Sequence, residues 1–144
     1  MHSILFVCYA NVCRSPIAEF VMKQVVRQAG VSDQFRIESA GTDADEGADI
    51  WFKSKETMDR YGVPWESRCA RQLTSGEYGE WDMIMVMDYQ NLRDAKAIFD
   101  GDPEGKVRLL NGRGAIADPY FHGDFDKSYE EIRSGCLALL SELS

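Results

Sequence analysis

Residues 8–15 read C-Y-A-N-V-C-R-S and combine a thiol, a guanidinium and a hydroxyl at a spacing that could do chemistry. Cys8 ends an apolar run that predicts a buried strand, and Pro16 suits the first turn of a helix that begins after the loop. The backbone N–H groups of such a loop, together with the helix N-terminus, form an anion site. Arg14 adds a planar fork that matches phosphate geometry. Because these positive surroundings also favour a thiolate, the pattern predicts attack by Cys8 on a bound phosphoryl group.

Strands and helices are predicted to alternate along the chain. Apolar runs predict strands at residues 3–8, 35–41, 83–87 and 106–110. Helices are expected from the N-cap Ser15 to Gly30, over residues 49–61, after the N-cap Asp88, and from about Asp126. This order predicts a single α/β domain over residues 1–144, with a four-stranded parallel sheet, helices on both faces and a Rossmann-like arrangement. The loop after the first strand would then lie at the carboxyl edge of the sheet, where ligands bind.

The composition argues against several classes of function. The net charge of −8 argues against nucleic-acid binding, which needs clustered Lys and Arg. The sequence has no long apolar run and no signal peptide, so we expect no membrane span and a cytoplasmic location. Two histidines, and four cysteines without a C-x-x-C pair, argue against a zinc site and a disulfide framework, so no metal or other cofactor is expected. A monomer is the simplest expectation.

Several blocks of this sequence resemble those of one enzyme family. Residues 7–16 resemble V-C-x-G-N-x-C-R-S-P, the signature of the low-molecular-weight protein tyrosine phosphatases. The blocks S-A-G-T at 39–42, A-R-Q-L at 70–73, M-D-Y-Q-N-L at 87–92 and D-P-Y at 118–120 are similar to further family segments, in the same order. The resemblance therefore spans nearly the whole chain. It implies metal-independent hydrolysis of phosphotyrosine in proteins, and of small aryl phosphates, through a phospho-cysteine intermediate.

The resemblance also implies a role for each matching residue. Cys8 would be the nucleophile, Arg14 would clamp the phosphoryl oxygens, and Asp118 would be the general acid. Asp118 would protonate the leaving phenolate and then act as base for the water that hydrolyses the intermediate. The alternative for Asp118 is a turn residue, because Asp before Pro is common in turns.

The other matching residues would form the phosphate-binding loop or its surroundings. The residues implied to build or support the loop are Tyr9, Ala10, Asn11, Val12, Cys13, Ser15 and Ser39. Asn11 tolerates a left-handed backbone, and by resemblance its side chain holds the loop through Ser15 and Ser39. The Ser15 hydroxyl could also donate to the Cys8 sulfur, which competes with its use as a helix cap. Tyr120 and Tyr9 could line the substrate entrance.

Cys13 has no part in this chemistry. In the family, the matching cysteine can form a disulfide with the nucleophile and so protect it from irreversible oxidation. We therefore hypothesise that Cys8 and Cys13 form such a redox-sensitive pair here.

Three positions depart from the family pattern. Ala10 replaces the loop glycine, and its methyl group requires a backbone angle that an L-residue can adopt. Arg68 stands where many relatives have a His that supports Asn11, so that support must be rebuilt or lost. Residues 43–49 are acidic where relatives often carry a Trp-His pair that forms one wall of the pocket. An acidic wall predicts a preference for neutral or basic residues beside the phosphotyrosine.

Three other functions compete with this interpretation. Thioredoxin-coupled arsenate reductases share the loop but need two closely spaced downstream cysteines, whereas Cys69 and Cys136 lie far apart. Protein-arginine phosphatases favour Thr at the position of Val12, so Val12 favours phosphotyrosine over phosphoarginine only weakly. A phosphate-binding module without catalysis would fit Ala10 and Arg68.

Overall fold

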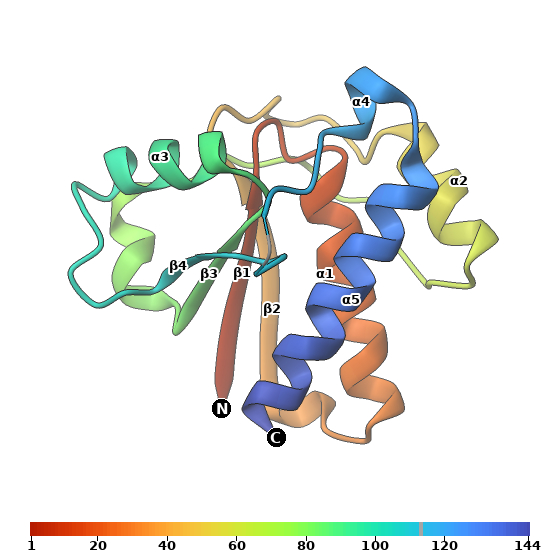
Figure 1. The fold of residues 1–144 in the computed structure, drawn as a ribbon, viewed down its shortest axis with the longest axis horizontal. Helices are drawn as coiled ribbons and strands as arrows, with labels where there is room; N and C mark the ends of the chain where they lie inside the picture. The colour runs from red at the N-terminus through yellow and green to blue at the C-terminus, as the bar shows by residue number, and fades with distance from the viewer. Residues whose placement is uncertain (113) are drawn as a thin grey trace.

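A parallel sheet of four strands runs through the middle of the molecule, in the order β2-β1-β3-β4 (Figure 1). This computed structural model describes residues 1–112 and 114–144. The strands are β1 (His2–Cys8), β2 (Phe35–Gly41), β3 (Met83–Val86) and β4 (Val107–Leu109). The α/β class and the four parallel strands are as predicted. β3 is shorter than predicted because Met87 leaves the ladder: its N–H donates to the Asn91 side chain and its carbonyl accepts from Ile116.

Helices cover both faces of the sheet, which confirms the predicted layers (Figure 1). On one face, α1 (Arg14–Gln28) packs against α5 (Phe125–Leu143), and α2 (Phe52–Arg60) packs against both. The other face carries α3 (Tyr89–Ile98) and the 3₁₀ turn η2 (Ser75–Glu80). A second 3₁₀ turn, η1 (Ser32–Gln34), precedes β2, and the short helix α4 (Pro119–His122) lies between β4 and α5.

The alternation of side chains along β1 divides the apolar interior into two cores. Ile4 and Phe6 face the core beneath α1 and α5, whereas Leu5 and Val7 face the core beneath α3. All four side chains are fully buried, as expected for a central strand covered on both faces. β1 is therefore a rigid support for the loop that follows Cys8.

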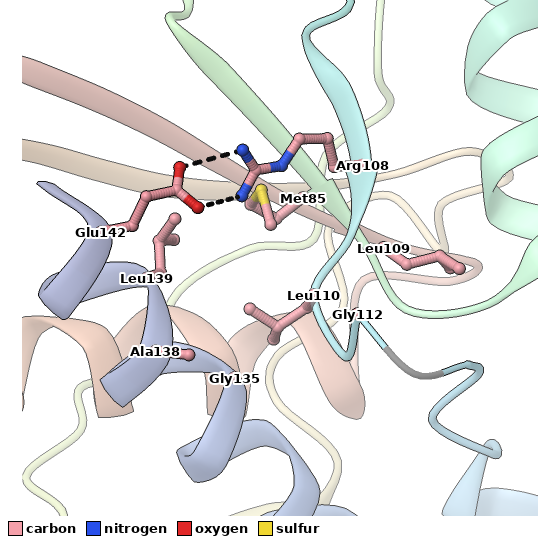
Figure 2. A pocket seen from close by; sticks show the side chains of 9 residues that line it. All are labelled: Met85, Arg108, Leu109, Leu110, Gly112, Gly135, Ala138, Leu139 and Glu142. Atoms are coloured by element: carbon pink, nitrogen blue, oxygen red, sulfur yellow. Dashed lines mark hydrogen bonds and ion pairs between the residues drawn. The ribbon is translucent and has the colours of Figure 1, made fainter.

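Helix α5 packs closely on the chain that follows β4. A Cβ atom at Gly135 would lie 2.7 Å from Cγ of Leu110, so only glycine allows this approach. The core face of α5 is buried at Tyr129, Ile132, Cys136 and Leu139, with Leu140 and Leu143 partly buried. Next to this contact lies a hollow of about 480 Å³, bordered by the two-bond ion pair of Arg108 with Glu142 (Figure 2).

The strand order places a topological switch point between β1 and β3. The chain passes from β1 to β2 on one side, and later to β3 and β4 on the other. Ligands bind at the carboxyl ends of strands at such a point. β1 ends at Cys8, and the loop that follows it lies at this edge together with the start of α3 (Figure 1). Asp88 is the N-cap residue of α3. No helix in the described part of the chain is long and apolar enough to span a membrane.

Candidate active site

The sulfur of Cys8 lies at the end of β1 and is almost entirely buried, with 3% of the residue exposed. The Ser15 hydroxyl oxygen is 3.0 Å from this sulfur. The prediction that Ser15 caps the helix is wrong, because Cys13 occupies the N-cap position and makes no side-chain capping bond. Ser15 lies inside the first turn of α1, and this leaves its hydroxyl free to serve the sulfur.

The side chain of Asn11 sets the direction of that hydroxyl. Its amide Nδ2 donates to the oxygens of Ser15 at 2.8 Å and Ser39 at 3.1 Å, while its Oδ1 accepts from the backbone N–H of Arg71 at 3.0 Å. The Arg71 contact fixes which end of the amide faces the hydroxyls. Because the Ser15 oxygen accepts from Asn11, its own hydrogen is free to point at the Cys8 sulfur. Asn11 has φ of 61°, the left-handed conformation that the sequence suggested.

Arg68 rebuilds the support that the family's His would give. Its guanidinium donates to the carbonyl of Asn11 at 2.9 Å and to the Ser39 hydroxyl at 3.1 Å. The Ser39 hydroxyl in turn donates to Glu19 at 2.6 Å, and Glu19 pairs with Lys23 at 2.7 Å. Burial lowers the pKa of Arg68, while the charges of Glu19 and Cys8 oppose that shift. The loop is thus held from beneath by a charged network.

Arg14 is almost completely buried, with 2% of the residue exposed, and protein acceptors hold its guanidinium in place. Its Nη1 donates to Asp88 and to the carbonyl of Ile116, both at 2.7 Å. Its Nη2 lies 3.7 Å from the Asp118 carboxylate, and its buried Nε has no partner among the described residues. Burial opposes the charge, but Cys8, Asp88 and Asp118 outweigh it and raise the pKa of Arg14. The guanidinium is therefore fixed at one end and free to bind a ligand through Nε.

The hydrogen bond from Arg14 to Asp88 was not predicted from the sequence. Asp88 was predicted only as the cap of α3, and one of its oxygens does accept from the N–H of Asn91 at 2.7 Å. The other oxygen binds Arg14. The M-D-Y-Q-N-L block was the available signal, but nothing in it pointed to a residue 74 positions earlier.

Asp118 has the features expected of a turn residue and also the position expected of a general acid. It is the N-cap of α4 and accepts from the N–H of Tyr120 at 3.1 Å, as a turn residue would. Its carboxylate also lines the pocket above Cys8, with 23% of the side chain exposed. A capping oxygen and a pocket oxygen can belong to the same carboxylate.

The pocket above the loop has a volume of about 320 Å³. Its floor contains Cys8, Ala10, Val12, Cys13 and Arg14, and its sides contain Tyr9, Asp45, Trp51, Asp118, Tyr120 and Phe121. Asn11, Ser15 and Ser39 are buried behind the floor. The structure thus brings together all the residues that the sequence singled out.

The floor accommodates Ala10 without strain, since it is not among the described residues with positive φ. The glycine that matters is Gly41, where an added Cβ atom would lie 2.6 Å from the Tyr9 carbonyl oxygen. The S-A-G-T block therefore serves the close approach of β2 to the loop.

The expected acidic wall is wrong in most of its residues. In the 43–49 segment, only Asp45 lines the pocket. Asp43 accepts from the Tyr9 hydroxyl at 2.7 Å, and Asp49 pairs with Lys55 at 2.7 Å. The wall is completed by Trp51, whose ring lies 5.7 Å from that of Tyr120. Trp51 was not predicted as a pocket residue, because it lies just beyond the 43–49 segment that corresponds to the wall in relatives.

Cys13 is a buried thiol rather than a second nucleophile. Burial, followed by the charge of Cys8, raises its pKa to about 12. All four cysteines of the chain are free thiols in this structure.

The hollow between β4 and α5 is larger than this pocket but carries less chemistry. Its charged groups, Arg108 and Glu142, already bind each other at 3.0 Å (Figure 2). In residues 1–112 and 114–144, no cluster of His, Cys, Asp and Glu could hold a metal ion. The smaller cavity, above Cys8, is the one lined by a thiol, a guanidinium and a carboxylate that are available to a ligand.

Known proteins resemble this chain over its whole length. The family model described as low molecular weight phosphotyrosine protein phosphatase matches residues 3–144. A human protein of that name is 35% identical over 150 residues, covering 97% of this chain and 94% of its own. A low molecular weight protein tyrosine phosphatase from Streptococcus pyogenes has a crystal structure with TM-score 0.91 and 34% identity, covering 100% and 94% of the two chains. The structure of YfkJ from Bacillus subtilis gives TM-score 0.95 at 27% identity, covering 99% and 94%.

Proposed function

The chain belongs to the low molecular weight phosphotyrosine protein phosphatase family, and from that premise we propose that it hydrolyses phosphotyrosine in proteins, and small aryl phosphates, through a phospho-cysteine on Cys8. The observation that carries the proposal is one pocket in which Cys8, Arg14 and Asp118 meet. The remaining contacts explain how each group would work.

The floor of the pocket suits a dianionic phosphoryl group. In the described part of the chain, the backbone N–H groups of residues 9–13 donate to no protein acceptor. The Nε of Arg14 is likewise unpartnered and buried. A buried donor without an acceptor is costly, so a ligand that accepts from the Arg14 Nε gains the full strength of that bond. Phosphoryl oxygens would fill this role, and more strongly as charge spreads over them in the transition state.

In the first step, the Cys8 thiolate attacks phosphorus. The S–P bond forms as the bond from phosphorus to the phenolic oxygen breaks. Asp118, in its carboxylic acid form, gives its proton to that oxygen, so that tyrosine leaves neutral. The hydroxyl of Ser15, at 3.0 Å, can donate to the sulfur before attack and again when the sulfur becomes the leaving group.

In the second step, water hydrolyses the intermediate. The Asp118 carboxylate takes a proton from water as its oxygen attacks phosphorus, and the S–P bond breaks to return the thiolate. Inorganic phosphate leaves, and Asp118 is again protonated. Arg14 needs no rearrangement between the steps because Asp88 and the Ile116 carbonyl hold it throughout.

The pocket walls favour an aryl substrate over phosphoarginine. The rings of Trp51 and Tyr120 can pack on a phenyl ring, and Val12 presents no hydroxyl. An arsenate reductase relay is poorly supported, since Cys136 is fully buried in α5 and Cys69 is exposed. The two features that suggested a binding module are accommodated, because Ala10 has an ordinary backbone and Arg68 supports the loop.

The test is hydrolysis of p-nitrophenyl phosphate in EDTA by the wild type, Cys8→Ser, Asp118→Ala and the matched control Cys69→Ser. We expect no turnover by Cys8→Ser, a fall of about 10²–10⁴-fold in kcat for Asp118→Ala, and normal activity for Cys69→Ser. Rapid quenching should find phosphate on Cys8. Undiminished activity of Cys8→Ser would end the proposal. Phosphotyrosine and phosphoarginine compared side by side would decide between the two substrates.

We also propose that the protein acts as a cytoplasmic monomer on phosphotyrosine proteins, without nucleic acid or membrane as partner. The charge of −8 supports the exclusion of nucleic acid. A Cys8–Cys13 disulfide is proposed under oxidation, supported by the presence of both residues in the pocket. Peptide mapping after mild peroxide that finds only sulfinic or sulfonic acid at Cys8 would reject that pair.

A further inference from the structure

Four aromatic rings form a continuous strip at the mouth of the pocket. The Trp51 ring lies 4.9 Å from that of Phe52 and 5.7 Å from that of Tyr120, and the Tyr120 ring lies 5.3 Å from that of Phe121. We call these four residues the aromatic shelf. Two elements supply them, the start of α2 and the short helix α4, which lie at the same end of the molecule as the loop (Figure 1).

Most of the shelf is exposed to solvent. Phe52 is 52% exposed, Tyr120 59% and Phe121 83%. Elsewhere in the described chain, large exposed apolar side chains do not form such a run of ring contacts; those away from the pocket mouth are Met1, Tyr61, Tyr89 and Leu137. Contiguous exposed apolar surface beside a binding site marks an interaction surface more often than scattered residues do.

The shelf extends beyond what a phosphotyrosine ring would cover. Trp51, Tyr120 and Phe121 line the pocket of about 320 Å³, but Phe52 does not. Phe121 lines the pocket and is still largely exposed. A ring seated over Cys8 would therefore contact the inner part of the shelf and leave its outer part uncovered.

We propose that the aromatic shelf binds an apolar side chain of the substrate protein within two residues of its phosphotyrosine. This inference rests on the proposed function and adds a substrate class to it. An extended peptide can place one side chain in the pocket and another on the adjoining shelf, because residues two apart lie on the same side about 7 Å from each other.

Other occupants fit the shelf less well. The shelf shares Trp51, Tyr120 and Phe121 with the pocket, so a second copy or a lipid surface seated there would cover the mouth and exclude substrate. Asp45 on the same mouth, and the chain's net charge of −8, also oppose an anionic membrane and a second copy. A peptide covers the shelf while it delivers its phosphate to Cys8.

The test uses phosphotyrosine peptides of equal charge that carry a single Leu, moved from two residues before to two residues after the phosphotyrosine, in a Gly-Ser background. We expect kcat/KM to rise about fivefold at one position, which is the value of partly burying one apolar side chain. Phe52→Ser should remove that preference and Phe52→Leu should keep it. The matched control Leu137→Ser, 43% exposed on α5, should behave as the wild type. All three variants should hydrolyse p-nitrophenyl phosphate normally, because this substrate does not reach Phe52.

Three results would contradict the proposed binding of an apolar side chain on the shelf while leaving the proposed function intact. The first is efficient hydrolysis of every peptide with no preference for Leu at any position. The second is a preference for Leu that survives in Phe52→Ser. The third concerns a dimer. A wild type that sediments as a dimer at assay concentration, with Phe52→Ser a monomer, would assign the shelf to a second copy instead. If no substrate turns over, the proposed function fails, and the Kd ratio of Leu and Ser peptides for the Cys8→Ser protein still tests the shelf.

Discussion

The floor and the mouth of the pocket are built on opposite principles. Directly behind the floor, the polar side chains of Asn11, Ser15 and Ser39 are buried and hydrogen-bonded to defined partners. At the mouth, Phe52, Tyr120 and Phe121 are more than half exposed. Their ring contacts run through Trp51, which joins Phe52 to Tyr120, and from Tyr120 to Phe121. A floor of fixed donors suits one reacting group, whereas exposed rings suit a variable partner. The difference supports our proposals that the floor carries the chemistry and that the mouth selects the substrate.

The largest test of this comparison is Arg14→Lys. Lysine keeps the charge but lacks the planar fork that binds Asp88 and Ile116 and leaves Nε for the proposed phosphoryl ligand. We expect kcat for p-nitrophenyl phosphate to fall about 10²–10³-fold, the usual loss for a preorganised donor. The control is Arg93→Lys on α3, whose side chain donates to Gln90 on the same helix and lies outside the pocket lining. Full activity of Arg14→Lys would mean that the floor needs charge alone.

A smaller effect is expected from Arg68→Met, which removes support from beneath the floor. Asn11 and Ser39 would each lose a donor, so that the loop and the Ser15 hydroxyl would be less well held. We expect kcat to fall about tenfold, since a charged hydrogen bond contributes about 1.5–3 kcal/mol. Arg68→Lys should restore part of kcat, whereas Arg93→Met should leave kcat unchanged.

The burial of the Cys13 thiol in the floor also predicts that the protein becomes less stable at alkaline pH. The pKa of Cys13 is raised to about 12 in the fold, mainly by burial. A thiol that ionises in the unfolded chain but not in the folded one supports the fold below the unfolded pKa and loses that support as pH rises. Above pH of about 9, stability should therefore fall by about 1.4 kcal/mol per pH unit from this group.

The measurement is urea unfolding of the wild type and Cys13→Ala at several values between pH 8 and pH 11. Cys136 is also buried, and its pKa is raised, so the variant should keep part of the slope. A slope unchanged by Cys13→Ala would show that the floor is more open to water than its contacts indicate.

The smallest effect is expected at the mouth from Asp45→Asn. Asp45 is the carboxylate of the 43–49 segment that lines the pocket. It should repel acidic residues beside the phosphotyrosine, by about threefold in kcat/KM at low salt for an exposed charge. Asn should remove the preference for basic over acidic peptides, while Glu46→Asn, outside the pocket lining, should retain it. Equal rates for acidic and basic peptides with the wild type would contradict this view of the mouth.

Most of the fold and the centre of the site could be predicted from the sequence, because both depend on patterns among neighbouring residues. The apolar run before Cys8, the strands at 35–41 and 83–86, and the cap at Asp88 depend on neighbouring residues and were recovered within a few positions. Cys8 and Arg14 are six positions apart, at the two ends of one loop, so their proximity could be predicted without the rest of the chain.

Only the tertiary structure decided what surrounds that loop. Three contacts around the loop join residues that are 57 to 74 positions apart in the sequence. They are the bond of Arg14 to Asp88, the bond of Arg68 to Asn11, and the ring contact of Trp51 with Tyr120. It also assigned the Ser15 hydroxyl to the sulfur rather than to the helix end. Parallel strands with helical crossovers bring distant segments to one edge of the sheet, and their order in space is not written in local periodicity. The reactive groups are therefore readable from neighbouring residues, whereas their partners depend on how the sheet is assembled.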